Sequence, residues 1–190
     1  DPAGTGGDEV AYAIGGVVAP YLHATAIGGL QGGVSKENLE IIVQLVKQYN
    51  VRTVLVEKNM GHGTVLFIIQ NYFNEVVDGR PRVSGVSLIE KYSTKQKELR
   101  IIEALRPPMQ RHRLVVHRNA IEQDFQDLKH YALHNRNVRS CFTQMQDITT
   151  DRGCLSKDDR LDALAMLVEH LGGFLVQDEE LASRKRQEAK

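Results

Sequence analysis

The stretch LSKDDRLDALAMLVEHLGG, residues 155–173, places the strongest constraint on this chain. Its apolar residues recur at helical spacing and predict a buried helix over residues 159–172. Three aspartates, Asp158, Asp159 and Asp162, stand where this helix begins. One aspartate is enough to cap a helix N-terminus. Like charges gathered inside a fold are costly unless cations neutralise them. The fold must therefore bring cations to this point.

Composition predicts an ordinary globular domain. The 190 residues are 42% apolar and 25% charged, which is enough for one full core. Lys+Arg and Asp+Glu both total 24, so the net charge is zero. This balance argues against a protein that only coats nucleic acid, but not against a nuclease, whose acidic site offsets basic residues elsewhere. The two cysteines are too far apart for a CxxC motif, and we expect free thiols and no zinc site.

Hydrophobic periodicity predicts a mixed α/β fold. Two apolar runs over residues 9–19 and 21–29 predict an antiparallel hairpin. Ser35 is the expected N-cap of a following amphipathic helix, and the buried strand VRTVLV then leads to Glu57. In chain order, the further expected elements are a helix over about 62–77, a turn in VDGRP, a strand in RVSGVSLIE, a helix stopped by Pro107 and Pro108, a strand before His117, a helix over 119–133, a weakly extended segment over 142–148 and the helix over 159–172.

The expected domain covers residues 1–176, and residues 177–190 are expected to form a polar C-terminal tail. Asp1 opens DPAGTGGDE, a Gly-rich turn of the kind that follows a strand. The first strand of the domain is therefore expected to precede residue 1.

Acidic residues fall where the predicted strands end and where the last helix begins. Asp1 opens the turn after a strand, Glu57 ends another strand, and Asp159 and Asp162 share one helix face. Singly, each has a plainer explanation, such as a helix cap or an ion pair of Glu57 with Lys58 or Arg52. Together, oxygen ligands without His or Cys favour Mg²⁺ or Mn²⁺. Two such ions about 3.5–4 Å apart support phosphodiester cleavage.

Four segments in this order resemble the nuclease domain of the large terminase subunit of tailed bacteriophages, in its podophage branch. They are DPAGTGGDE, VEKNMGHG, KELRIIEALRPPMQRHRLVV and KDDRLDALAMLVEHL. The resemblance implies a ribonuclease-H-like α/β fold, with helices flanking a mixed central sheet whose first three strands are antiparallel. It also implies a metal-dependent endodeoxyribonuclease that cuts concatemeric viral DNA during genome packaging. The ATPase domain that powers translocation, with its Walker motifs, is not in this sequence.

The resemblance and the residue pattern together predict a set of site residues. The expected catalytic residues are Asp1, Glu57 and Asp159. The expected ligands of two Mg²⁺ or Mn²⁺ ions are Asp1, Glu57, Asp158, Asp159 and Asp162. Asp8 and His62 are expected beside the site, supporting it without binding metal directly. The expected contacts to the DNA backbone are Lys95, Lys97, Arg100, Arg111 and Arg113, for which a solvated helix face is the alternative.

The implied partners are those of a packaging motor: double-stranded DNA, the ATPase domain of the same full-length protein, the small terminase subunit and the portal protein. The implied location is the host cytoplasm, with transient docking on the procapsid, and no membrane is expected. Two other functions stay open. One is a nuclease like the Holliday-junction resolvases, which would need a dimer and branched DNA. The other is a non-catalytic DNA-grip or docking module, which would gain from losing the acidic residues.

Overall fold

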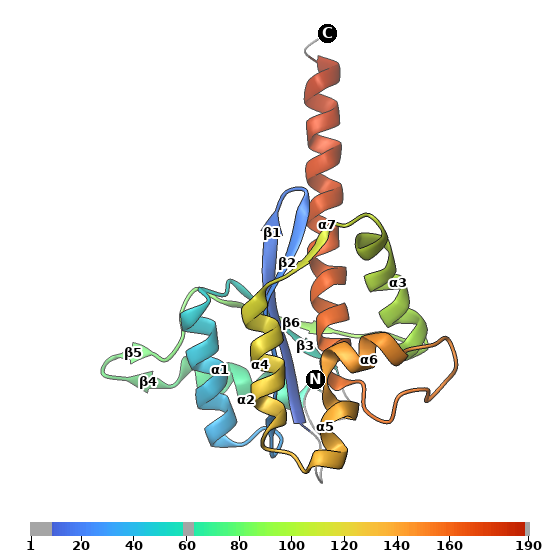
Figure 1. Ribbon diagram of the computed structural model, residues 1–190. Coiled ribbons are helices and arrows are strands. Elements are labelled where there is room, and N and C mark those ends of the chain that lie inside the picture. The colour runs from blue at the N-terminus through green and yellow to red at the C-terminus, as the bar shows by residue number, and fades with distance from the viewer. Residues whose placement is uncertain (1–8, 59–62, 189–190) are drawn as a thin grey trace. The chain divides into compact units, whose positions relative to one another are not determined.

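The computed structural model of the chain describes residues 9–58 and 63–188, with side chains described as far as residue 175 (Figure 1). Asp1, Asp8 and His62 therefore lie outside the described residues. The chain divides into two compact units. One unit contains residues up to Tyr12 and Gly29–Thr94, and the other contains Ala13–Gly28 and everything from Lys95 onward.

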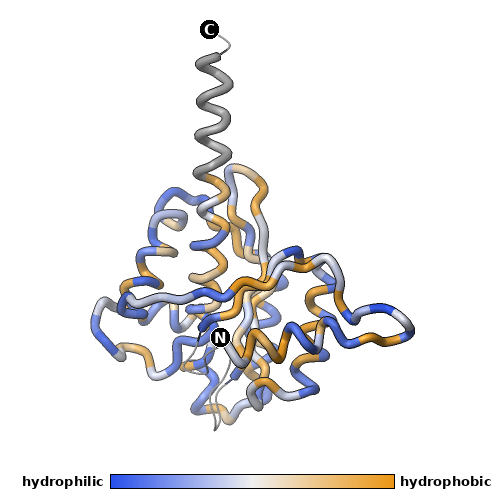
Figure 2. Tube along the Cα trace, turned by 180° about the vertical axis from the view of Figure 1, so that it is seen from behind, coloured by the Kyte–Doolittle hydropathy of each residue, from blue (hydrophilic) through white to orange (hydrophobic). Residues whose placement is uncertain are grey.

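The first two strands form the predicted hairpin. Strand β1 (Glu9–Val18) and strand β2 (Tyr21–Gln31) are joined by a two-residue turn, and β7 (Leu114–Val116) pairs with β2 in parallel. The strand order is β1–β2–β7, so this sheet is mixed. Figure 2 shows mainly apolar residues along the hairpin. This arrangement confirms the expected α/β class with a mixed sheet and antiparallel first strands.

A second ladder positions Glu57. Helix α1 (Lys36–Gln48) begins at the predicted cap, where the Ser35 side chain accepts a hydrogen bond from the Asn38 N–H at 3.2 Å. Strand β3 (Thr53–Glu57) follows and pairs in parallel with β6 (Ser87–Lys91). Helix α2 (Thr64–Asn74) lies between these strands in the chain. The buried side chains of this unit are Leu39, Val43, Val46, Val56, Ile69, Phe73 and Val83.

The expected turn in VDGRP is the tip of a small hairpin of two short strands, β4 (Val76–Val77) and β5 (Arg80–Pro81). Asp78 and Gly79 both have positive φ, of 52° and 76°, as a tight two-residue hairpin turn requires. Helix α2 therefore ends at Asn74, before the end that the sequence indicated, because the chain turns into this hairpin.

The other unit is mostly helical. It contains α3 (Lys97–Gln110), α4 (Arg118–Leu128), α5 (Leu133–Arg139), α6 (Cys141–Asp147) and α7 (Asp159–Glu188). Buried residues of α7 pack with residues of β2, α3, α4 and α6 into one apolar core: Leu22, Ala24, Ile27, Ile101, Leu105, Ala120, Cys141, Leu161, Leu164, Ala165, Val168, Leu171 and Leu175. Within the described residues, no helix is long and apolar enough to cross a membrane.

Two expectations about helix ends were wrong. Pro107 and Pro108 lie inside α3 and do not stop it. Proline removes an N–H donor but keeps its carbonyl. Both prolines lie in the last turn of α3, which ends at Gln110, and their carbonyls accept from the N–H groups of Arg111 at 3.2 Å and Arg113 at 2.7 Å just beyond that end. The backbone of the expected polar tail is also helical, because α7 continues to Glu188.

The segment between residues 119 and 148 also differs from its prediction. The helix expected over 119–133 is α4, which ends at Leu128, and a further helix that was not expected, α5, begins at Leu133. The expected extended stretch over 142–148 is the short helix α6. Ser140 provides the cap of α6, since its side chain accepts from the Thr143 N–H. Cys141 and Gln144 are both buried. Capping and burial therefore override the weak local preference for extended backbone.

Close packing within the hairpin makes two adjacent glycines non-equivalent. A Cβ on Gly15 would collide with the backbone carbonyl oxygen of His23 and come within 3.0 Å of the Leu167 side chain, whereas a Cβ on Gly16 would meet nothing within 4 Å. We expect Gly15→Ala to lower the free energy of unfolding by roughly 1–3 kcal/mol or more. Gly16→Ala should change it by less than about 1 kcal/mol. Urea unfolding of both variants measures this, and equal effects would contradict the described strand pairing.

Candidate active site

The start of α7 presents the three aspartates that the sequence singled out. Asp159 is the first residue of the helix, and the backbone carbonyl of Asp158 accepts from the Asp162 N–H at 2.8 Å. The side chain of Gln144, on α6, accepts from the backbone N–H of Leu161 at 2.9 Å. One of the N–H groups at this helix end is thus satisfied from a neighbouring helix.

Two cations of α3 neutralise two of these aspartates. Asp162 is fully buried, and the Arg100 Nη2 atom lies 2.7 Å from its Oδ1 and 2.8 Å from its Oδ2. The Lys97 ammonium lies 3.2 Å from Asp162 Oδ2 and 2.9 Å from Asp158 Oδ1. Lys97 and Arg100 are three residues apart on α3 and therefore share a face. Lys97 and Arg100, which belong to the same compact unit as α7, therefore provide cations for Asp158 and Asp162.

The beginning of α3 also holds the loop that leads into α7. The Gln96 side chain donates to the carbonyl of Thr150 at 3.0 Å, and the Glu98 carboxylate accepts from the Gly153 N–H at 2.6 Å. That backbone hydrogen bond to Gly153 lowers the pKa of Glu98. Residues 96–100 therefore fix both the approach to α7 and its first turn.

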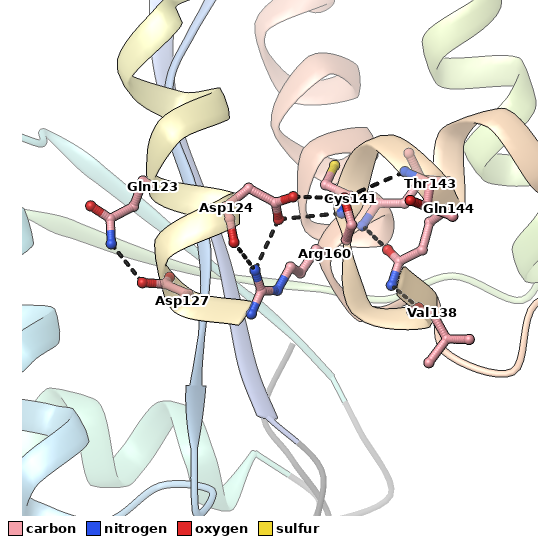
Figure 3. A network of polar contacts seen from close by, with 10 residues as sticks. Gln123, Asp124, Asp127, Val138, Cys141, Thr143, Gln144 and Arg160 are labelled. Atoms are coloured by element: carbon pink, nitrogen blue, oxygen red, sulfur yellow. Dashed lines mark hydrogen bonds and ion pairs between the residues drawn. The ribbon is translucent and has the colours of Figure 1, made fainter. Parts of the chain in front are cut away.

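On the other side of Asp159 in the sequence, Arg160 enters a buried polar network (Figure 3). Arg160 and Asp124 are both fully buried, and Arg160 Nη1 lies 2.9 Å from Asp124 Oδ1. Asp124 also accepts from the Ser140 hydroxyl at 2.8 Å and the Cys141 N–H at 3.3 Å. The network joins α4, α6 and the start of α7, so the first turn of α7 is held from several elements.

Sequence reasoning missed this network, although a signal was present. Arg160 stands four residues before Leu164, so the two residues share the apolar face of the helix. A charged residue on a buried face needs a buried partner. That partner, Asp124, lies 36 residues earlier in the chain, and no local sequence pattern identifies it.

Glu57 is the last residue of β3, as predicted, and stands opposite Lys91 in the β3–β6 ladder. Its side chain is partly buried. The neighbouring Lys58 pairs with Glu90 at 3.3 Å, and its N–H donates to the carbonyl of Lys91 at 2.7 Å. The strand end is thus tied to β6, which gives Glu57 a fixed backbone position.

The basic residues predicted to contact DNA lie in different surroundings. Lys95 is exposed and pairs with Glu103 at 2.7 Å, Arg111 is exposed at the C-terminal end of α3, and Arg113 is partly buried. Lys97 and Arg100 face the aspartates of α7, and Arg100 is only 9% exposed. Contact of any of the five with DNA stays a prediction. For Arg100 the observed role is neutralisation of Asp162.

Cys141, whose backbone N–H donates to Asp124 in this network, has a buried thiol. Burial, helped by the nearby Asp124 carboxylate, raises its pKa, so it stays neutral. Over the described ranges, no three His, Cys, Asp or Glu side chains converge in a way that could hold a metal ion.

The mixed sheet, its flanking helices and the acidic residues at a strand end and a helix start define a ribonuclease-H-like domain. A family model described as "Terminase Bacteriophage T7, Ribonuclease H-like domain" matches residues 1–114. The large terminase subunit of Enterobacteria phage T3 is 33% identical over 172 residues, which cover 90% of this chain and 28% of that protein. The chain belongs to the ribonuclease H-like domain family of T7-type terminases, which confirms the resemblance to the terminase nuclease domain. It spans little more than a quarter of the relative's length.

The buried network leads to a stability prediction. Arg160→Met leaves the Asp124 carboxylate buried without its cation, and we expect a loss of roughly 3–5 kcal/mol in the free energy of unfolding. The double variant Arg160→Met/Asp124→Asn should recover much of this loss, because the amide oxygen still accepts from Ser140. Arg118 forms an exposed ion pair with Glu122, with side chains 88% and 57% exposed, and Arg118→Met should cost less than about 1 kcal/mol. Urea unfolding at neutral pH compares the three variants, and equal losses for Arg160→Met and Arg118→Met would contradict the assignment.

Proposed function

We propose that this chain is a divalent-metal-dependent DNA endonuclease that cuts concatemeric phage DNA during genome packaging. The family match over residues 1–114 carries this proposal, because it assigns the acidic strand end at Glu57 to a ribonuclease-H-like terminase domain. The acidic first turn of α7 supports it from a part of the chain beyond that match.

The donor chemistry fits Mg²⁺ or Mn²⁺. The proposed ligands are Asp1, Glu57 and Asp159, with Asp158 and Asp162 as further candidates, and all of them offer only carboxylate oxygens. Asp1 lies outside the described residues. When bound, two divalent ions would activate a water molecule and stabilise the leaving oxygen of a phosphodiester.

The residues of the chain have separate tasks in this proposal. Glu57 and Asp159 provide fixed negative charge from the end of a strand and the start of a helix, the rigid positions on which a reaction site depends. Arg160, through Asp124, and Gln144, through the Leu161 N–H, hold that first turn just after Asp159. The proposed contacts to the DNA backbone are Lys95, Lys97, Arg100, Arg111 and Arg113. Asp8 and His62 are proposed to support the ligands.

The partners follow from the packaging role. We propose double-stranded DNA as the substrate, and as neighbours the ATPase domain of the full-length protein, the small terminase subunit and the portal. The T3 relative is named only as a large terminase subunit, so these partners and the host cytoplasm as location rest on the proposed role. The resolvase-like and DNA-grip alternatives are separated from it by the two experiments below.

The first experiment tests metal-dependent cleavage. Supercoiled plasmid incubated with the chain should be cut in Mg²⁺ or Mn²⁺ and left intact in EDTA, because a chelator removes the ions that would activate the water and stabilise the leaving oxygen. Four-way junction DNA serves as the competing substrate. Plasmid cleavage in excess EDTA would contradict metal dependence, cleavage of the junction alone would favour the resolvase alternative, and DNA binding without cleavage would favour the grip.

The second experiment assigns roles to the acidic residues. Asp1→Ala, Glu57→Ala and Asp159→Ala should each reduce plasmid cleavage to background while the fold persists, because each removes a proposed metal ligand. Asp147→Ala, at the exposed end of α6, is the matched control and should cleave normally.

Asp162→Ala should behave differently from these variants. It removes the buried carboxylate that lies 2.7 Å from the Arg100 guanidinium, so we expect a loss of roughly 3–5 kcal/mol in the free energy of unfolding. Its cleavage should fall less than that of Asp159→Ala at temperatures where it stays folded. Normal cleavage by any of the first three variants would remove that residue from the site.

A further inference from the structure

The ladder of β3 and β6 ends in an exposed aromatic side chain with a lysine beside it. Tyr92 directly follows β6 and is 70% exposed. Lys58 directly follows β3, and its ammonium lies 6.0 Å from the centroid of the Tyr92 ring, within the range of a cation–π contact. Both residues belong to the same compact unit as Glu57. A single exposed apolar residue is ordinary on a protein surface, so the neighbours of Tyr92 decide what it can bind.

Lys58 is held in a defined place beside this ring. Its backbone N–H donates to the carbonyl of Lys91 at 2.7 Å, which ties it to the end of β6. Its ammonium lies 3.3 Å from a carboxylate oxygen of Glu90, and its side chain is 41% exposed. A lysine ammonium has three N–H donors, so one that is anchored by a carboxylate can still donate to a ligand. The ladder end therefore presents a positioned cation next to an accessible aromatic ring.

This pair lies next to Glu57, the proposed metal ligand of the strand end. Glu57 precedes Lys58 in the chain, and Lys91, which stands opposite Glu57 in the ladder, precedes Tyr92. Successive side chains of a strand point to opposite faces, so Lys58 flanks Glu57 and does not share its face. A ligand bound by this pair would therefore lie beside the reacting phosphodiester of the proposed function and not at it.

These features fit a nucleotide whose base is unpaired. Proteins that bind single strands without sequence preference stack bases on aromatic rings and place cations along the backbone. A paired base is already stacked within its duplex and offers no free face to a tyrosine. Lys58 lies beside the ring of Tyr92, whose large exposed fraction leaves the ring accessible to a base.

We propose that Tyr92 and Lys58 bind an unpaired nucleotide next to the cleavage position, Tyr92 by stacking on the base and Lys58 through the phosphate. This inference rests on the proposed nuclease function and adds a feature of the substrate to it, namely DNA that is single-stranded or locally opened beside the cut. Tyr92 and Lys58 are then substrate contacts that take no part in the bond cleavage.

The test is binding of a single-stranded oligonucleotide to the full chain in EDTA, where the proposed cleavage is absent. The oligonucleotide contains several 2-aminopurines, bases whose fluorescence falls when they stack on an aromatic ring. Tyr92→Ala should weaken binding by roughly tenfold and reduce the quenching, because one base–aromatic stack is lost. Tyr92→Phe keeps the ring and should bind within about twofold of the unsubstituted chain.

Two controls show whether a loss of binding is specific to this contact. Tyr21→Ala removes a tyrosine that is 44% exposed in the other compact unit, and it should change neither the affinity nor the quenching. On a fully paired duplex of the same sequence, Tyr92→Ala should bind like the unsubstituted chain. If Tyr92→Ala weakens binding to the duplex and to the single strand equally, or weakens neither, the proposal is wrong.

Lys58→Met tests the phosphate contact. It should flatten the dependence of log affinity on log salt by about 0.7 units, the slope that one phosphate contact contributes on a single strand. Lys47→Met removes an exposed lysine from the last turn of α1 and should leave this slope unchanged. An unchanged slope for Lys58→Met would mean that Lys58 only pairs with Glu90, and the proposed phosphate contact would be overturned.

The outcomes separate this inference from the proposed function. If the unsubstituted chain cuts plasmid in Mg²⁺ but does not bind the oligonucleotide, or if Tyr92→Ala binds it equally tightly, the inference fails and the nuclease proposal stands. If Tyr92→Ala loses oligonucleotide binding as expected but the unsubstituted chain leaves plasmid intact in Mg²⁺ and Mn²⁺, the nucleotide contact stands and the nuclease proposal fails.

Discussion

The ion pairs between α3 and the first turn of α7 are the interaction on which the rest of the helical unit depends. Asp162 is fully buried, and a buried carboxylate is tolerated only when a cation and hydrogen bonds accompany it. Arg100 and Lys97 satisfy this need, so α3 must lie where its two cations reach the aspartates. The same end of α3 holds the loop before α7 through Gln96 and Glu98. The need to neutralise the buried Asp162 therefore also determines where α3 lies.

A second set of contacts secures the same turn from another direction. Arg160 pairs with Asp124 of α4, and Gln144 of α6 accepts from the Leu161 N–H. A proposed metal ligand, Asp159, is thus followed directly by two residues, Arg160 and Leu161, that buried partners hold in place. The proposed cleavage of DNA with carboxylate ligands needs a backbone that does not move at those ligands. Burying this polar network costs desolvation free energy, but its hydrogen bonds and ion pair fix the geometry of the first turn of α7.

Much of the fold was predictable because its signals are local. The Ser35 cap, the strand that ends at Glu57 and the β1–β2 hairpin each depend on neighbours a few residues away, and all three were confirmed. The errors arose where a local rule was overridden. Pro107 and Pro108 lie in the last turn of α3, where hydrogen bonds from Arg111 and Arg113 to their carbonyls close the helix end, and α6 is helical because Ser140 caps it and Gln144 is buried.

By itself, the sequence determined the α/β class, the family and the presence of a charged helix start that needs cations. These properties follow from periodicity, from capping and from the order of short motifs, which are all readable along the chain. Only the tertiary structure decided which cations form ion pairs with the aspartates, because Lys97 and Arg100 lie more than sixty residues before them in the chain. The same holds for the Asp124–Arg160 pair. The sequence gives the sign of each charge. The pairing of buried charges depends on their distance in space, and only the packing of α3, α4 and α6 around α7 sets that distance.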